Sequence, residues 1–143
     1  FLYDLKGKKL KQICKNGYFG QIVGKYIAIQ TISSSGKSGM TLYRKSDGQK
    51  IKTITSNCSY YEFIDNTFYY VEPIAEFKYK IKSYNIEKKK TITYGTIKAN
   101  EFGAITSKYL YYSNGPMIGE CKYYKYSFAK KKSIRITEEA FQY

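Results

Sequence analysis

One aromatic element recurs along this chain at a nearly constant interval, and this repeat constrains the fold more than any other feature. Its anchoring tyrosines are 40, 41 and 42 residues apart: Tyr3, Tyr43, Tyr84 and Tyr126. A second element, a Lys or Thr followed by an apolar run, begins at Lys25, Thr67 and Lys108, with spacings of 42 and 41 residues. A period of about 41 residues built from short apolar runs is typical of β-propeller blades, because helical repeats would show 3.6-residue periodicity.

Each repeat contains four short segments that read as strands. The first segment covers residues 18–23, 60–64 and 101–105 in successive repeats, and the second is the apolar run. The third carries the anchoring tyrosine, and the fourth follows a polar turn, as in residues 50–54. Eighteen Tyr and eight Phe against two Pro favour strands, because aromatic side chains suit a pleated surface. We therefore predict an all-β fold, a partial β-propeller of four-stranded antiparallel blades.

The repeat also predicts how the chain divides. Residues 18–58, 59–99 and 100–137 each form one blade, residues 1–17 supply the third and fourth strands of a partial blade, and residues 138–143 form the first strand of a next blade. A propeller has typically 4–8 blades, so this set does not close a ring. We expect the remaining blades to come from the same protein or from a second copy of the chain.

Lysine is concentrated in and beside the fourth strand of each repeat. The net charge is +14, and only Arg44 and Arg135 are arginines. Lysine on an edge strand opposes edge-to-edge aggregation, which accounts for many of these positions. The alternative is a basic patch for an anionic surface, whereas the scarcity of arginine argues against specific nucleic-acid recognition. The residues of this candidate patch are Lys88, Lys89, Lys90, Lys130, Lys131 and Lys132.

Three segments of the repeats resemble the YWTD propellers of the low-density-lipoprotein-receptor type and related bacterial propeller domains of unknown function. The segment 111–114 (Tyr-Tyr-Ser-Asn) stands where the family has Tyr-Trp-Thr-Asp, and 69–72 (Tyr-Tyr-Val-Glu) is a second copy. The segment 42–48 is similar to the family's third strand and its Asp-Gly turn. The resemblance implies a six-bladed, usually extracellular, ligand-binding scaffold without enzymatic activity.

No pattern in the sequence predicts catalysis or a cofactor. The segment 33–38 ends like a phosphate-binding P-loop, but Thr31 replaces the motif's first Gly and a strand, not a helix, is expected to follow. The eleven acids are scattered and histidine is absent, so no acid–base pair or zinc site is indicated. The three cysteines are widely spaced, and we expect unpaired thiols.

Binding through loops is the leading functional hypothesis. The connections between second and third strands are expected to be long, at residues 30–39, 72–78 and 113–121. Two of them carry apolar residues that are candidates for a contact with a protein or glycan: Ile74, Phe77, Met117 and Ile118.

Two alternatives remain open: the non-catalytic part of an enzyme whose active site lies in other blades, or an electrostatic binder of polyanions. No apolar run approaches the ~20 residues of a membrane span, and no signal peptide is visible. We expect an extracellular or cell-surface location, in a bacterium, with the cytoplasm as the alternative.

Overall fold

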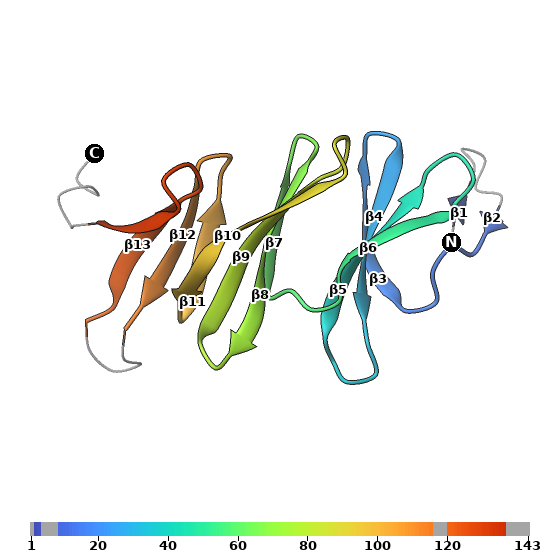
Figure 1. Cartoon of the computed structure of the whole chain (residues 1–143). Coiled ribbons are helices and arrows are strands. Elements are labelled where there is room, and N and C mark those ends of the chain that lie inside the picture. The colour runs from blue at the N-terminus through green and yellow to red at the C-terminus, as the bar shows by residue number, and fades with distance from the viewer. Residues whose placement is uncertain (1, 4–8, 116–119, 137–143) are drawn as a thin grey trace. The chain divides into compact units, whose positions relative to one another are not determined.

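In the computed structural model the chain is built from β-strands (Figure 1). The structure describes residues 2–3, 9–115 and 120–136, and the side chains from residue 12 onward within these ranges. The predicted all-β class is confirmed, with three antiparallel four-stranded sheets. Within the described ranges, the chain has no helix with the length and apolar character needed to cross a membrane.

The strands group into two compact units, of which unit 1 spans Phe1–Cys58. It holds the pair β1 (Leu2–Tyr3) and β2 (Lys9–Lys11) and one four-stranded sheet in the order β3-β4-β5-β6. The strands of this sheet are β3 (Gly17–Val23), β4 (Tyr26–Ile32), β5 (Ser38–Arg44) and β6 (Lys50–Thr55).

Unit 2 spans Ser59–Tyr143 and contains the other two four-stranded sheets. Each sheet is a simple antiparallel meander, because strands consecutive in sequence are neighbours in the sheet. One sheet contains β7 (Tyr60–Ile64), β8 (Thr67–Ala75), β9 (Lys78–Asn85) and β10 (Lys90–Lys98). The other contains β11 (Glu101–Ile105), β12 (Tyr109–Asn114), β13 (Lys122–Ser127) and β14 (Lys132–Ile136).

The strands agree closely with the predicted segments, but two of the predicted connections are shorter than expected. β7 and β11 coincide with the predicted first strands, and β6, β10 and β14 are end strands of their sheets, as expected for the lysine-rich fourth segments. The long connection predicted over residues 72–78 is wrong. β8 continues through Pro73 to Ala75, which pairs with Lys78, so only a tight turn remains. The pairing of β8 with β9 therefore continues beyond Glu72 and lengthens the hairpin.

The two sheets of unit 2 pack face to face through aromatic side chains. Phe102 of β11 is stacked on Tyr60 of β7, with ring centroids 5.4 Å apart, and meets the edge of Tyr79 at 4.8 Å. The Tyr60 hydroxyl also donates a hydrogen bond of 3.1 Å to the carbonyl of Gly103. Aromatic pairs of this kind contribute about 0.5–1.5 kcal/mol each beyond their buried area. These contacts bring β7 and β11, the first strands of the two sheets, against each other.

Side-chain alternation explains which residues enter this core. In β12, Leu110 and Tyr112 point into the core, whereas Tyr111 between them faces the other side of the sheet. Full burial of an aliphatic side chain stabilises the fold by about 1.5–3 kcal/mol. The buried members of the cluster are Val71, Ile81, Ile97, Ala99, Leu110, Tyr112, Tyr126 and Phe128.

Candidate functional site

The β8–β9 turn presents two large apolar side chains to solvent. Ile74, at the end of β8, is 48% exposed, and Phe77, in the turn itself, is 45% exposed. The turn is fixed on both sides, since Ala75 pairs with Lys78 and the Ala99 amide donates a 2.9 Å hydrogen bond to the Phe77 carbonyl. The two predicted contact residues of this segment therefore lie on a rigid hairpin end and not on a long loop.

Phe77 also adopts a backbone conformation that is unusual for its size. Its φ is 55°, in the left-handed region. There the Cβ atom of a residue crowds the backbone carbonyl oxygen, whereas glycine has no Cβ atom. In unit 1, the turn between β4 and β5 has Gly36 at the corresponding place, with φ of 78°. The chain thus keeps an exposed phenylalanine where glycine would fold with less strain.

The other two predicted contact residues, Met117 and Ile118, lie outside the described residues. The long connection predicted over residues 30–39 of unit 1 is also wrong: β4 continues to Ile32 and β5 begins at Ser38, so a turn over residues 33–37 remains. The Ser33 amide donates to the Lys37 carbonyl at 2.9 Å, and β5 follows at Ser38. A strand follows this serine-rich segment, so the helix N-terminus that a P-loop needs is absent there.

The six candidate lysines occupy two equivalent turns of unit 2. Three lie at the β9–β10 turn and the start of β10, and three at the β13–β14 turn and the start of β14. All six are exposed: Lys88, Lys89, Lys90, Lys130, Lys131 and Lys132. Ion pairs in the described part of the chain lie elsewhere, between Lys82 and Glu72 at 2.6 Å and between Arg44 and Asp47 at 2.8 Å.

Among the acids that the structure describes, Asp47 is the one whose pKa shifts most clearly. The Gln49 amide donates to its carboxylate at 3.0 Å, and the Arg44 guanidinium binds it from the other side. These contacts hold the pKa of Asp47 below its usual value, the Gln49 hydrogen bond most of all. The carboxylate closes the β5–β6 turn ahead of Gly48, whose φ is 70°. Its role is that of a turn residue, as the Asp-Gly pattern predicts.

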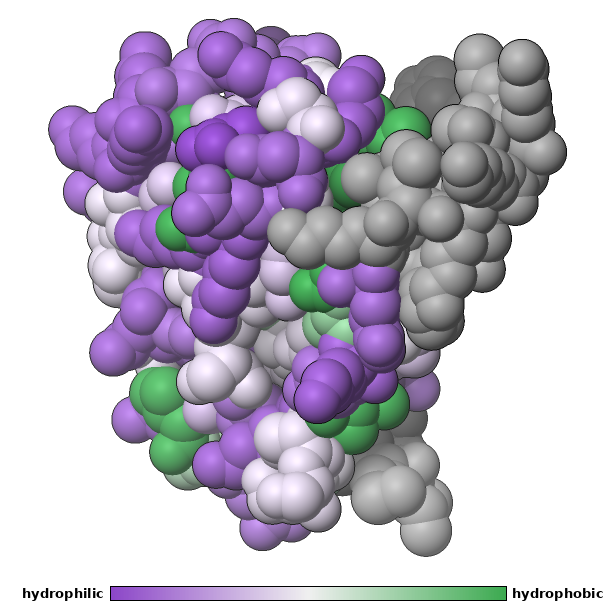
Figure 2. All heavy atoms as spheres, turned by 90° about the vertical axis from the view of Figure 1, so that its right-hand side faces the viewer, coloured by the Kyte–Doolittle hydropathy of each residue, from purple (hydrophilic) through white to green (hydrophobic). Residues whose placement is uncertain are grey.

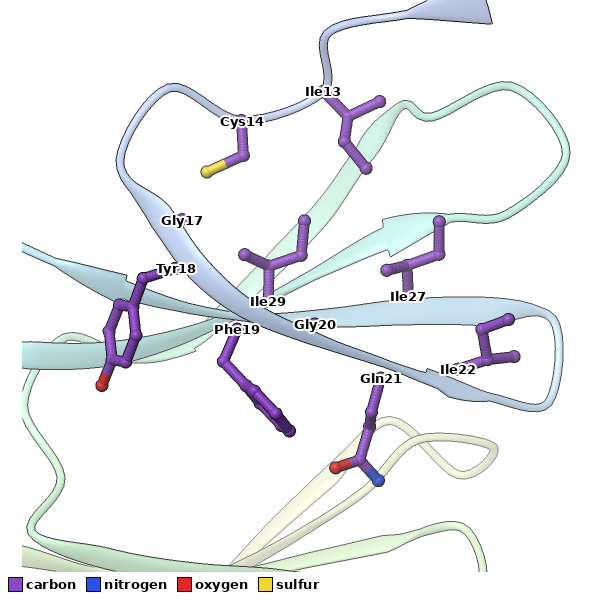
Figure 3. Close-up of a pocket in the computed structure, with 10 residues that line it drawn as sticks. All are labelled: Ile13, Cys14, Gly17, Tyr18, Phe19, Gly20, Gln21, Ile22, Ile27 and Ile29. Carbon is purple, nitrogen blue, oxygen red and sulfur yellow. The ribbon is translucent and has the colours of Figure 1, made fainter. Parts of the chain in front are cut away.

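A hollow of about 320 Å³ lies on one face of the sheet in unit 1 (Figure 3). Ile27 and Ile29 point into it from β4, and Ile13 and Cys14 lie over the same side of the sheet. The Cys14 thiol donates a hydrogen bond of 3.4 Å to the Asn16 side-chain oxygen, and it lies near the Tyr43 hydroxyl. Burial, with the contact to Cys14, raises the pKa of Tyr43 to about 12. No disulfide joins any two of the cysteines at positions 14, 58 and 121.

A second hollow, of about 590 Å³, lies in unit 2 on the sheet formed by β11–β14. Tyr111, Tyr123 and Ile136 line it together with residues of β11, and Tyr123 is 52% exposed. Sequence reasoning missed its tyrosines because they alternate with the core residues of the same strands. The pattern that could have revealed this hollow is the pair of consecutive tyrosines in β12, which places an aromatic side chain on each face of the strand.

The face drawn in Figure 2 is mostly hydrophilic in its described part. Hydrophobic side chains appear there as separate spots, which is ordinary for a protein surface. Among the residues that the structure describes, no three Cys, Asp or Glu side chains gather in a way that could hold a metal ion. The arrangement offers surfaces for contact: an apolar turn and two lysine-rich turns.

Comparison with known proteins adds no further lead: no family model matches the chain, and a search of curated proteins finds no match.

Proposed function

We propose that this chain is a segment of a β-propeller whose blades follow the sequence repeat of about 41 residues, and that it acts as a non-enzymatic binding scaffold. The β8–β9 turn, with Ile74 and Phe77, is its contact surface for a protein or glycan. An extracellular or cell-surface setting, in a bacterium, suits such a scaffold.

The pairing of the strands supports the blade repeat. In each four-stranded sheet, an apolar residue near the start of the second strand pairs with a buried tyrosine on the third. These tyrosines are three of the anchoring tyrosines of the sequence repeat, and the pairs are Ile27 with Tyr43, Phe68 with Tyr84, and Leu110 with Tyr126.

The turns support the same repeat through their backbone conformation. The position after the third strand that needs positive φ is occupied by Gly48, Lys89 and Lys131, which follow one another at the same intervals as the anchoring tyrosines. Gly24 and Asp65, in the turns between first and second strands, keep this period too, with φ of 58° and 52°. Chain segments that share both register and turn conformation are expected to form equivalent structural units.

The packing inside unit 2 supports blades that stack on one another. A propeller blade lies against its neighbour face to face, with the first strands nearest the axis. In unit 2 the first strands β7 and β11 meet through Tyr60 and Phe102. The last strands are the end strands of the two sheets, where exposed lysines are tolerated.

The observation that carries the binding role is the conformation of Phe77. A left-handed φ at a bulky residue costs about 1–3 kcal/mol, and such strain is retained where it serves a function. Phe77 is also too exposed for its ring to be explained by core packing alone. With Ile74 near it in sequence, the turn offers an aromatic and an aliphatic anchor on a rigid support, as contact surfaces commonly do.

The test is a screen of arrayed glycans and displayed peptides with the wild-type chain, followed by two variants. Phe77→Gly and Ile74→Ser should each weaken binding of any selected ligand by about tenfold or more, while far-UV circular dichroism stays unchanged. Tyr123→Ser, on the exposed face of another sheet, is the matched control and should bind normally. Ligands that bind all variants equally would show that the β8–β9 turn is not the contact surface.

A further inference from the structure

The two lysine-rich turns of unit 2 lie at the end of the sheets opposite to the β8–β9 turn. β9 runs from Lys78 to Asn85, so the turns at its two ends are separated by the length of the strand. The β9–β10 and β13–β14 turns lie at one end of unit 2 (Figure 1). A ligand bound there would occupy a surface distinct from Ile74 and Phe77.

The β13–β14 turn is anchored against the neighbouring sheet. Phe128, which begins the turn, is stacked on Tyr69 of β8 with ring centroids 4.8 Å apart, and lies 4.9 Å from the Tyr94 ring of β10. Lys90, the first residue of β10, belongs to the same strand as Tyr94. The packing of Phe128 thus joins the lysine-bearing turn of one sheet to the sheet that carries the other lysine-bearing turn.

Both turns have a fixed backbone. The Lys88 amide donates to the Asn85 side chain at 2.9 Å, and the Lys131 amide donates to the Ser127 carbonyl at 2.8 Å. The Lys130 amide is held by the Ser127 hydroxyl at 3.1 Å. The lysine side chains therefore project from positions that are set before any ligand arrives, which lowers the entropy lost on binding.

Two of the lysines occupy positions that folding alone would assign to glycine. Lys89 and Lys131 have φ of 52° and 53°, whereas the corresponding turn in unit 1 has Gly48. Edge protection does not account for them, because Lys89 and Lys131 lie in turns and not in the end strands β10 and β14. Each of these lysines keeps a strained backbone conformation and adds to a group of like charges. We infer that the charges themselves have a role in binding.

Among the described residues, few negative charges lie near these lysines. Glu87 belongs to the β9–β10 turn, and its carboxylate accepts a 2.9 Å hydrogen bond from the side-chain amide of Asn66. Asp65 lies in the β7–β8 turn, which is at the same end of unit 2. Lys108, in the β11–β12 turn there, adds another positive charge. The described turns at this end of unit 2 therefore carry more positive than negative charges.

We propose that these two turns form a binding site for a linear phosphate polymer that is not a nucleic acid. Lysine binds phosphate as a point charge and needs no fixed orientation of the ligand, in contrast to the planar fork of arginine. A phosphate polymer of sufficient length can contact both turns, which lie at the same end of unit 2. Recognition of bases would call for exposed aromatic side chains among the lysines, and the described residues of these turns offer only Phe128, which is buried.

The test measures binding of inorganic polyphosphate to the whole chain across a range of salt concentrations. The Lys89→Gly/Lys131→Gly double variant removes two charges and leaves turns that glycine tolerates well. We expect it to bind about tenfold more weakly at about 0.1 M salt, with the salt-dependence slope reduced by about two. Lys88→Gln/Lys130→Gln, which leaves the φ > 0 positions untouched, should show a similar loss.

The matched control is Lys37→Gln/Lys45→Gln, which lowers the net charge equally but lies in unit 1. It should keep at least half of the wild-type affinity. An equal loss in this control, or an unchanged affinity in Lys89→Gly/Lys131→Gly, would overturn the site. Single-stranded DNA with the same number of phosphates should bind more weakly than polyphosphate because its charges are farther apart, and equal or tighter binding of DNA would refute the assigned ligand class.

Discussion

Gly95 of β10 lies directly against the hydroxyl of Tyr126 on the neighbouring sheet. A Cβ atom at residue 95 would lie 2.6 Å from that oxygen, closer than real Cβ atoms approach any heavy atom. Tyr126 is 3% exposed, and its hydroxyl has no hydrogen-bond partner among the residues that the structure describes. The absence of a side chain at residue 95 therefore creates the space in which this tyrosine is buried.

Replacing Gly95 by alanine should destabilise unit 2. The rigid Tyr126 ring cannot move aside without disturbing the core, and overpacking of this kind costs about 1–3 kcal/mol. Urea unfolding followed by circular dichroism measures the change. Tyr126→Phe in the same chain should recover most of the loss, because it removes the oxygen that the new methyl group meets. A double variant as unstable as Gly95→Ala alone would place the clash elsewhere.

Tyr126→Phe by itself should stabilise the protein. A buried hydroxyl without a partner carries an uncompensated desolvation penalty of about 1–3 kcal/mol, which the phenylalanine does not incur. We expect a gain of about 1 kcal/mol in the free energy of unfolding. Tyr112→Phe is the contrasting variant, because the Tyr112 hydroxyl is bonded to Ser133 at 2.6 Å and its removal should lower stability. If both variants had the same sign, hydroxyl pairing would not be the cause.

Phe102→Ala should be among the most damaging single changes in unit 2. The Phe102 ring is held between Tyr60 and Tyr79, and truncation of a packed phenylalanine costs about 3–5 kcal/mol when it is fully buried. Since Phe102 is only partly buried, we expect a loss of about 2–3 kcal/mol in urea unfolding. The exposed Tyr123 provides the comparison, because Tyr123→Ala should change stability by less than about 1 kcal/mol. Similar losses at the two positions would contradict the contact between the sheets.

Backbone conformation predicts opposite effects at two turns. Gly36 has φ of 78° and open space around its Cβ position, so Gly36→Ala should cost about 1 kcal/mol through the backbone alone. Phe77→Gly should leave stability unchanged or raise it by up to about 1 kcal/mol, since it relieves a left-handed residue. Thermal unfolding of the two variants measures both changes. A marked destabilisation by Phe77→Gly would mean that the ring serves packing and not ligand contact.

Stability should fall at alkaline pH. The pKa of Tyr43 is about 12 in the folded chain, against 10.0 for a free tyrosine, mainly because of burial. Between these values the unfolded chain releases the proton first, so rising pH favours unfolding by up to about 1.4 kcal/mol per pH unit for this group. Below pH 10 the group adds no pH dependence.

Urea unfolding midpoints measured between pH 10 and 12 show how far stability falls. The Tyr43→Phe variant should lose stability less steeply with rising pH than the wild type. The remainder should persist, because burial also raises the pKa of Tyr69, Tyr112 and Tyr126. A Tyr43→Phe curve that falls as steeply as the wild type would show that Tyr43 ionises normally in the folded chain.

Strand identity was available from the sequence because it depends on local pattern. The segments around Tyr43, Tyr84 and Tyr126 recur with the same neighbours, and the strands β7 and β11 begin and end as their residues predict. The length of β8 was not predictable in this way. A long connection was predicted to begin at residue 72, but pairing with β9 as far as Lys78 extends the strand, since hydrogen bonds to a partner outweigh local propensity.

The features of the candidate sites were likewise predictable from the sequence only in part. The sequence by itself determined the repeat, the four-stranded meanders, and the concentration of lysine at turns and end strands, because each follows from the order of neighbouring side chains. Only the tertiary structure decided that Phe77 and Lys89 adopt left-handed backbone, that Gly95 admits the Tyr126 hydroxyl, and that Phe128 joins two sheets. The Gly95 and Phe128 contacts depend on distances between residues far apart in the chain, which packing fixes and a one-dimensional pattern does not contain. The two left-handed turn residues depend on which residues pair at the ends of the strands.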